Sequence, residues 1–195
     1  MKQAGLFATI TSALRSMLGK AQMAPLPLTI GDKLYHQVLQ ASRSPTLYAD
    51  FGVEDSIDGR FDALCLMQSL VMRRMTGQGS ELSDTAQDMF DAMFQDMDLT
   101  LREMGVGDMG VGKRVKFMSE AFMGRLTSYD DALTANDVTA LEQALYRNIY
   151  REGAVAGDQA KLAEAVLQIV MRLDALDNQQ ILTGELPDDL LQIQN

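Results

Sequence analysis

The fold is decided by residues 84–133, which read DTAQDMFDAMFQDMDLTLREMGVGDMGVGKRVKFMSEAFMGRLTSYDDAL. Two apolar ridges at helical spacing flank the glycines of this stretch. The first ridge contains Ala86, Met89, Phe90, Met93, Met97, Leu101 and Met104, and the second contains Val111, Val115, Met118, Phe122, Leu126, Tyr129 and Leu133. We predict two amphipathic helices that form an antiparallel hairpin. Gly105 ends the first helix in a left-handed conformation and Asp108 caps the second.

The rest of the chain repeats the helical period and contains no convincing strand pattern. Further helices are expected at residues 32–43, in a short turn after Ser44-Pro45, at residues 61–75, from a cap at Asn136 or Asp137 to Gly153, and at residues 159–181. Residues 61–75 are apolar nearly all round and therefore belong at the centre of the bundle. The predicted fold class is all-α, a single-domain bundle of about six to seven helices with an N-terminal amphipathic helix. The predicted parts are a basic arm with a proline linker (1–29), a helical domain (30–183) and an acidic C-terminal tail (184–195).

The charge is uneven along the 195 residues. The whole chain carries a net charge of -10, yet its first 43 residues contain five basic residues and one acid, so the remainder carries -14. The negative total argues against a general nucleic-acid binder, which needs clustered basic residues. With one Cys and one His, the chain can form neither an internal disulfide nor a Cys/His zinc site, and any nucleophile–histidine device depends on His36.

The N-terminal arm reads as an amphipathic helix that is too short and too charged to span a bilayer. Its apolar arc and flanking charge supply the predicted membrane-contacting residues Leu6, Phe7, Ile10, Leu14, Arg15 and Leu18. Three interpretations stay open: a helix in a membrane interface, a targeting segment, and a first helix packed on the protein's own core. A secretory signal fits less well because the apolar region is weak.

The glycines after residue 104 resemble two nucleotide-binding motifs, G-x-G-x-x-G and G-x-x-x-x-G-K-[ST]. Both motifs require a preceding strand, and here the preceding segment is helical. Arg114 also stands where a magnesium-binding hydroxyl is needed. We therefore interpret the segment as a structural turn, which brings the acidic first helix near the face of Lys113 and Lys116.

The remaining candidate sites are weak. Acid pairs such as Asp96 with Asp98 could be imagined as metal ligands, but one His cannot supply the two Glu-x-x-His motifs of a di-iron bundle, and no calcium loop is present. His36 is expected to be a structural or surface residue, with a single axial haem ligand as the alternative. Cys65 is expected to lie unreactive in the core. We predict no catalytic residue, metal or cofactor.

The chain from Gly52 to Tyr129 resembles the ubiquinol-cytochrome c chaperone family, the assembly factors of the cytochrome bc1 complex. The matching blocks are Asp58-Gly59-Arg60-Phe61, Met97-Asp98, Leu101 to Asp108 with Val111, Lys113 and Lys116, and Ala121 to Arg125 with Tyr129 and Ala132-Leu133. The resemblance implies a non-enzymatic all-helical chaperone. It would bind newly made cytochrome b and promote its haem loading and incorporation into the complex.

The resemblance also implies where the protein works and what it contacts. The implied location is the bacterial cytoplasm at the inner face of the membrane, or the matrix side of the mitochondrial inner membrane. A small co-chaperone and the ribosome are further implied partners, without sequence-specific nucleic-acid binding. The implied client or partner contacts are Arg102, Glu103, Asp108, Lys113, Lys116, Phe122, Arg125 and Tyr129. Core packing explains Phe122 and Tyr129 equally well.

Methionines are frequent and cluster where the resemblance is strongest. There are 14 in the chain, and those near the glycines are Met89, Met93, Met97, Met104, Met109, Met118 and Met123. Methionine is flexible and polarizable, which suits a deformable surface for an apolar client. We predict a client surface here, with a metal- or haem-binding helical protein or a generic interaction module as the alternatives.

Overall fold

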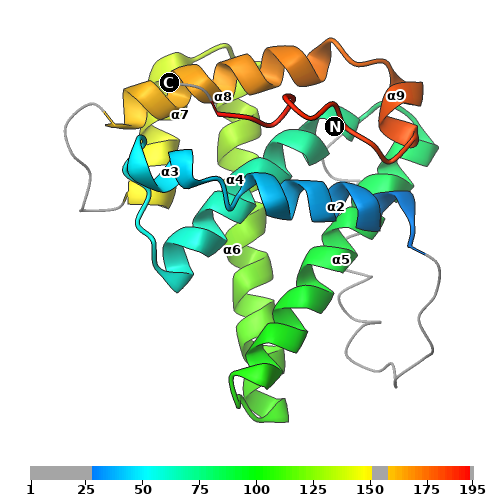
Figure 1. The fold of residues 1–195 in the computed structure, drawn as a ribbon, viewed down its shortest axis with the longest axis vertical. Helices are drawn as coiled ribbons and strands as arrows, with labels where there is room; N and C mark the ends of the chain where they lie inside the picture. The colour runs from blue at the N-terminus through cyan, green and yellow to red at the C-terminus, as the bar shows by residue number, and fades with distance from the viewer. Residues whose placement is uncertain (1–27, 151–157, 194–195) are drawn as a thin grey trace. The chain divides into compact units, whose positions relative to one another are not determined.

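The computed structural model describes residues 28–150 and 158–193, which fall into two compact units. Unit 1 contains the start of α2 (Ile30–Ala41), α5 (Ser80–Glu103), the first half of α6 (Asp108–Thr134) and α9 (Asn178–Leu182). Unit 2 contains the rest of α2 and α6 together with α3 (Pro45–Ala49), α4 (Ile57–Met75), α7 (Val138–Leu145), the π-helical turn η1 (Tyr146–Tyr150) and α8 (Asp158–Asp174). Every regular element in the described ranges is helical (Figure 1), which confirms the predicted all-α class.

Unit 1 is built on close contact between α2 and α5. The first helix begins at a reciprocal cap, in which the Thr29 amide donates to the Asp32 carboxylate at 2.8 Å and the Asp32 amide to the Thr29 hydroxyl at 3.1 Å. A Cβ added to Gly31 would lie 2.5 Å from the Asp88 Cβ, so only glycine permits this approach. One turn later the Tyr35 hydroxyl donates to the Asp96 carboxylate at 2.6 Å. These contacts fix α5, the first arm of the predicted hairpin.

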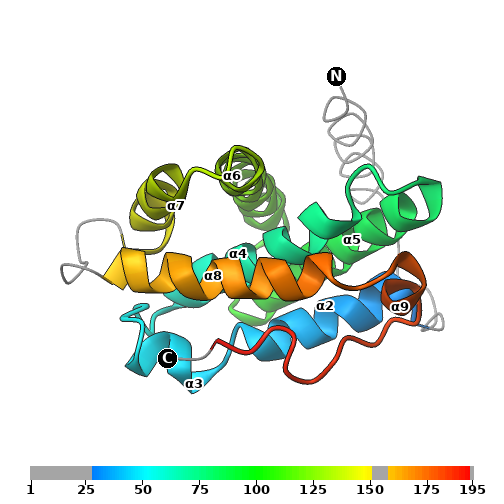
Figure 2. The same cartoon turned by 90° about the horizontal axis from the view of Figure 1, so that it is seen from above.

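Unit 2 is centred on α4, as the sequence predicts. Every residue from Asp62 to Met72 is buried, and Figure 2 shows α8 crossing α4 with α7 beside it. The helix begins at Ile57, four positions before the predicted start, because the Ser56 hydroxyl accepts from the Gly59 amide at 3.1 Å as an N-cap. The predicted cap of α7 is confirmed at Asp137, whose carboxylate accepts from the Ala140 amide at 2.9 Å.

The prediction of one helix over residues 159–181 is wrong. The chain forms α8 to Asp174 and then α9 from Asn178. Arg74 explains the break, because its guanidinium donates to the carbonyls of Leu173 at 3.1 Å and Leu176 at 2.5 Å. A side chain thus satisfies carbonyls at the end of the helix that would otherwise accept from later amides.

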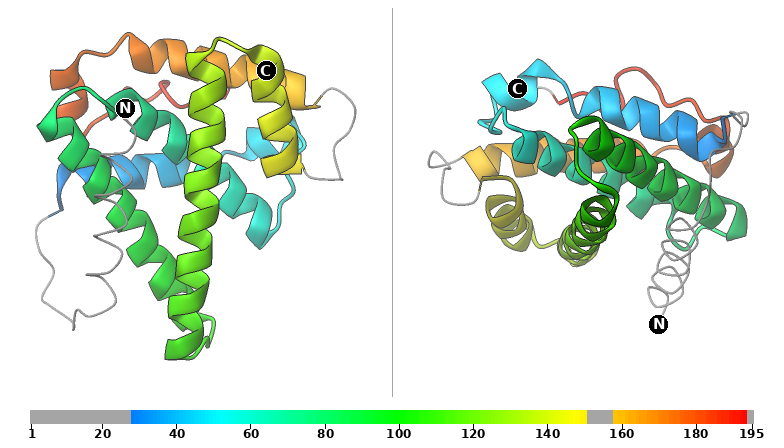
Figure 3. Two further views of the ribbon diagram at one scale, coloured as in Figure 1. Left: turned by 180° about the vertical axis from the view of Figure 1, so that it is seen from behind. Right: turned by 90° about the horizontal axis from the view of Figure 1, so that it is seen from below.

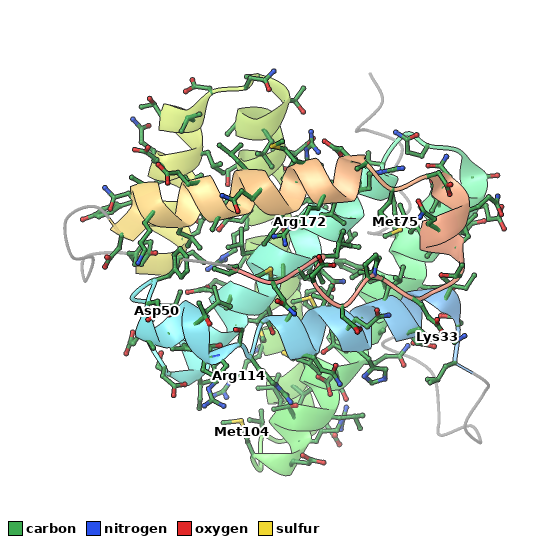
Figure 4. The ribbon with its side chains drawn as sticks, turned by 45° about the horizontal axis from the view of Figure 1, so that its top comes forward. Lys33, Asp50, Met75, Met104, Arg114 and Arg172 are labelled. Carbon is green, nitrogen blue, oxygen red and sulfur yellow. The ribbon has the colours of Figure 1, made fainter. Side chains whose placement is uncertain are left out.

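The last described residues pack onto unit 2. Leu186, Leu190, Leu191 and Ile193 are buried, and Arg172 donates to the Asp189 carbonyl at 2.6 Å and the Gln192 carbonyl at 2.7 Å. Figure 4 shows Arg172 beside this segment. The predicted membrane-contacting residues of the arm, and the predicted helix end at Gly153, lie outside the described residues.

Candidate functional site

The turn between α5 and α6 has the geometry expected of a helix stop. Gly105 adopts a φ of 82°, its amide donates to the Arg102 carbonyl at 2.9 Å, and the Val106 amide donates to the Leu101 carbonyl at 3.0 Å. This pair of bonds is a Schellman motif and confirms Gly105 as the stop. Figure 3 shows α5 and α6 meeting at this turn and spreading apart from it.

The turn is shorter than predicted. The second helix begins at Asp108, so Gly110 and Gly112 lie inside α6 rather than in a loop. The predicted role of Asp108 as a cap is wrong, because it is the first residue of α6 and its carboxylate accepts from Arg102. A Cβ on Gly110 would lie 2.9 Å from Val106 Cγ1, so this glycine lets the turn close tightly.

Arg102 ties the two helices together across the turn. Its Nε lies 2.5 Å from Asp98 one helical turn earlier, and its Nη1 donates to Asp108 on α6. Hydrogen bonds to Asp98 and then to Asp108 raise the pKa of Arg102 further above its ordinary value. All three side chains are substantially exposed, so their bonds align the hairpin while leaving polar edges open to a partner.

Four large apolar side chains are exposed near this turn. The exposed fractions are 59% for Leu99, 56% for Met104, 88% for Met109 and 71% for Phe117. Figure 4 shows the Met104 side chain pointing away from the ribbon. We name the segment from Leu99 to Phe117 the hairpin end. Exposed apolar side chains gathered with charged groups are typical of a protein-binding or membrane-binding surface.

The predicted methionine surface is present in part. Met104 and Met109 are exposed, but Met89 and Met93 are buried in unit 1 because they lie on the inward ridge of α5. Leu99 and Phe117 were not predicted. Both lie off the apolar ridges of their helices, and that position is the sequence signal that could have identified them.

The basic side of the hairpin end lies on α6. Lys113, Arg114 and Lys116 are all exposed. Within the described residues Lys116 pairs with Glu120 on its own helix at 3.8 Å, while Lys113 and Arg114 have no ion-pair partner. No ion pair in the described residues joins an acid of α5 to Lys113 or Lys116, so the predicted pairing across the turn is not formed. The ion pair that does cross the turn has the opposite polarity, with Arg102 on α5 and Asp108 on α6.

Three predicted contact residues belong to unit 2 and not to the hairpin end. Phe122 and Tyr129 are buried, so their side chains are part of the core and not open to a partner. Arg125 donates to the buried Asp62 carboxylate at 2.6 Å, and its guanidinium lies 5.8 Å from the centre of the Phe61 ring. Burial raises the pKa of the Tyr129 hydroxyl. The first five predicted contacts, Arg102 to Lys116, are exposed in unit 1, and the last three support the fold of unit 2.

The other candidate sites carry little chemistry. Cys65 is fully buried, and burial raises the pKa of its thiol, in agreement with the predicted core position. His36 is exposed on α2. In residues 28–150 and 158–193, no three Cys, His, Asp or Glu side chains gather as metal ligands. No helix in the same ranges is both long and apolar enough to cross a bilayer.

Comparison with known proteins agrees with the sequence resemblance. The family model described as ubiquinol-cytochrome C chaperone matches residues 49–188. A solved structure, the crystal structure of the Cbp3 homolog from Brucella abortus, is similar with a TM-score of 0.73 and 32% sequence identity, covering 95% of this chain and 97% of that one. No curated protein gives a significant match. The matched ranges include both halves of α6. The chain belongs to the ubiquinol-cytochrome c chaperone family.

Proposed function

We propose that this protein is an assembly chaperone that holds newly synthesised cytochrome b and promotes its haem loading and entry into the bc1 complex, without catalysing a reaction. Family membership supports the assembly role. The observation that carries the proposal is the hairpin end, where Leu99, Met104, Met109 and Phe117 expose apolar surface within the range that the family model matches.

The chemistry of the hairpin end suits an apolar membrane protein as client. Thioether side chains such as Met104 and Met109 adapt to irregular apolar partners because they are unbranched and polarizable. Around them Arg102, Glu103 and Asp108 provide hydrogen-bonding edges for the polar loops of a client. Lys113 and Lys116 complete a charged rim on α6. A partner would thus be held by apolar contacts and oriented by charge.

In this proposal the three predicted contact residues of unit 2 act on the client only indirectly. Phe122 and Tyr129 fill the core of unit 2, and Arg125 pairs with Asp62 there. We assign them the task of holding the second half of α6 in place. A change at these positions is then expected to lower client binding only through loss of folded protein.

A crosslinking experiment tests the client. A photoreactive phenylalanine analogue replaces Met104 or Met109 in the full chain, expressed in cells that assemble a bc1 complex. Met171 on α8 provides the matched control, because it is 72% exposed but lies in unit 2. We expect adducts with cytochrome b from the two hairpin positions and none from position 171.

Two results would contradict this proposal. One is the absence of cytochrome b from the adducts of both hairpin positions. The other is equal yield from position 171, which would mean contact without a preferred surface.

The proposed site of action is the inner face of the bacterial membrane. A small co-chaperone and the ribosome remain predicted partners that the same adduct analysis can detect.

A further inference from the structure

One face of α6 combines exposed apolar and basic side chains at regular spacing. Met109, Lys113 and Phe117 follow each other at intervals of four residues, so they lie along the same side of the helix. The row is about 12 Å long at the rise of an α-helix. Phe117 is 71% exposed, and its ring is the largest apolar group that α6 turns to water.

The charge of this face is opposite to that of the whole chain. Between Asp108 and Glu120, α6 carries Lys113, Arg114 and Lys116 and no acid, whereas the chain has a net charge of -10. Among the described residues, Lys113 and Arg114 have no ion-pair partner. A local positive patch of this kind attracts an anionic partner.

We propose that this face of α6 docks on an anionic lipid surface. A bilayer interface offers both environments that the face needs, acyl chains for Phe117 and Met109 and phosphate headgroups for the basic side chains. Long side chains such as Lys113 can extend to the headgroups while their methylene stems stay in apolar surroundings. An RNA partner would leave Met109 in water, and the negative total charge opposes binding to a long polyanion.

The lipid contact overlaps the proposed client contact. Met109, Lys113, Lys116 and Phe117 belong to both surfaces, and Arg114 belongs to the lipid contact alone. The inference does not rest on the identity of the client, because lipid binding is measured without any client. It assigns to the hairpin end a second partner, the membrane beside which an apolar membrane protein is held.

Fluorescence tests the lipid contact at one position, because the chain contains no Trp. Phe117→Trp in the full chain places the single indole on the proposed face, and Met171→Trp places it at an equally exposed position in unit 2. The two proteins are mixed with phosphatidylcholine vesicles, with or without phosphatidylglycerol, and no client is added. Lipids brominated on the acyl chain serve as the quencher.

We expect a blue shift and bromine quenching for Phe117→Trp with phosphatidylglycerol vesicles only, and neither effect for Met171→Trp. Replacing Lys113, Arg114 and Lys116 with Gln in the Phe117→Trp protein should weaken partitioning roughly 5-fold for each charge removed. The inference is overturned if the protein sediments with the vesicles while the indole at position 117 is unshifted, since another segment then makes the contact. It is also overturned if RNA, but not lipid, shifts the emission.

Discussion

The two halves of α6 differ although they form one continuous helix. In the first half Met109 and Phe117 are turned to solvent among basic residues, whereas in the second half Phe122, Leu126 and Tyr129 are buried. Residues that resemble the family occur in both halves. The difference teaches that a shared motif contains two kinds of residue, exposed ones that are open to a partner and buried ones that hold the helix in its unit.

The largest effect is expected at the ion pair of the second half. Arg125→Met leaves the Asp62 carboxylate buried without its guanidinium, which should lower the free energy of unfolding by about 3–5 kcal/mol. Arg102→Met is the matched control in the first half, where the exposed ion pairs should leave stability nearly unchanged. Urea unfolding followed by circular dichroism measures both variants. Equal losses in the two variants would erase the proposed distinction.

Alkaline pH should lower the free energy of unfolding through Tyr129, in the second half of α6. Burial raises the pKa of its hydroxyl, so above the ordinary tyrosine value the unfolded chain releases a proton that the folded chain retains. Stability is therefore fully present below that value and falls as pH rises above it, by up to about 1.4 kcal/mol per pH unit for one group. Urea midpoints between pH 8 and pH 11, read for wild type and Tyr129→Phe, should show a shallower fall in the variant. An identical pH dependence would mean that Tyr129 ionises as readily when folded.

The smallest effect concerns the glycines of α6. A Cβ at Gly124 meets nothing within 4 Å, so Gly124→Ala should stabilise the helix by about 0.5–1 kcal/mol. At Gly110 the new Cβ would lie 2.9 Å from Val106 Cγ1, and we expect that contact to cancel the gain. Thermal unfolding of the two alanine variants measures the contrast. A larger gain at position 110 than at position 124 would show that the turn is less tightly packed than described.

Most of the fold could be predicted from apolar residues that recur at the period of an α-helix. The apolar ridges of residues 84–133 identify the hairpin. Residues 61–75 are apolar on nearly every side of the helix, which places α4 at the centre of unit 2. The break between α8 and α9 was missed because its cause, Arg74, is about 100 residues away in the sequence. Long-range side-chain bonds of this type leave no local pattern.

The candidate site was predictable in its location but only partly in its residues. Gly105 and the charges from Arg102 to Lys116 could be read from the resemblance and from turn chemistry. The exposure of Phe117 was missed, although its position off the apolar ridge that contains the buried Phe122 is a signal that the sequence carries. The Thr29–Asp32 cap was also missed, although the spacing of a hydroxyl and an acid three residues apart is a known start signal.

The central claim is that the exposed hairpin end, and not the buried half of α6, is the surface on which cytochrome b depends. Cells whose only copy carries Leu99→Ser, Met104→Ser and Met109→Ser together test it, with Met171→Ser as the control and protein abundance checked by immunoblot. The measurement is the b-type haem content of the membranes by reduced-minus-oxidised spectra. The account predicts a strong loss of b-type haem in the triple variant at normal chaperone abundance, with no loss in the control. Normal b-type haem in the triple variant would contradict it.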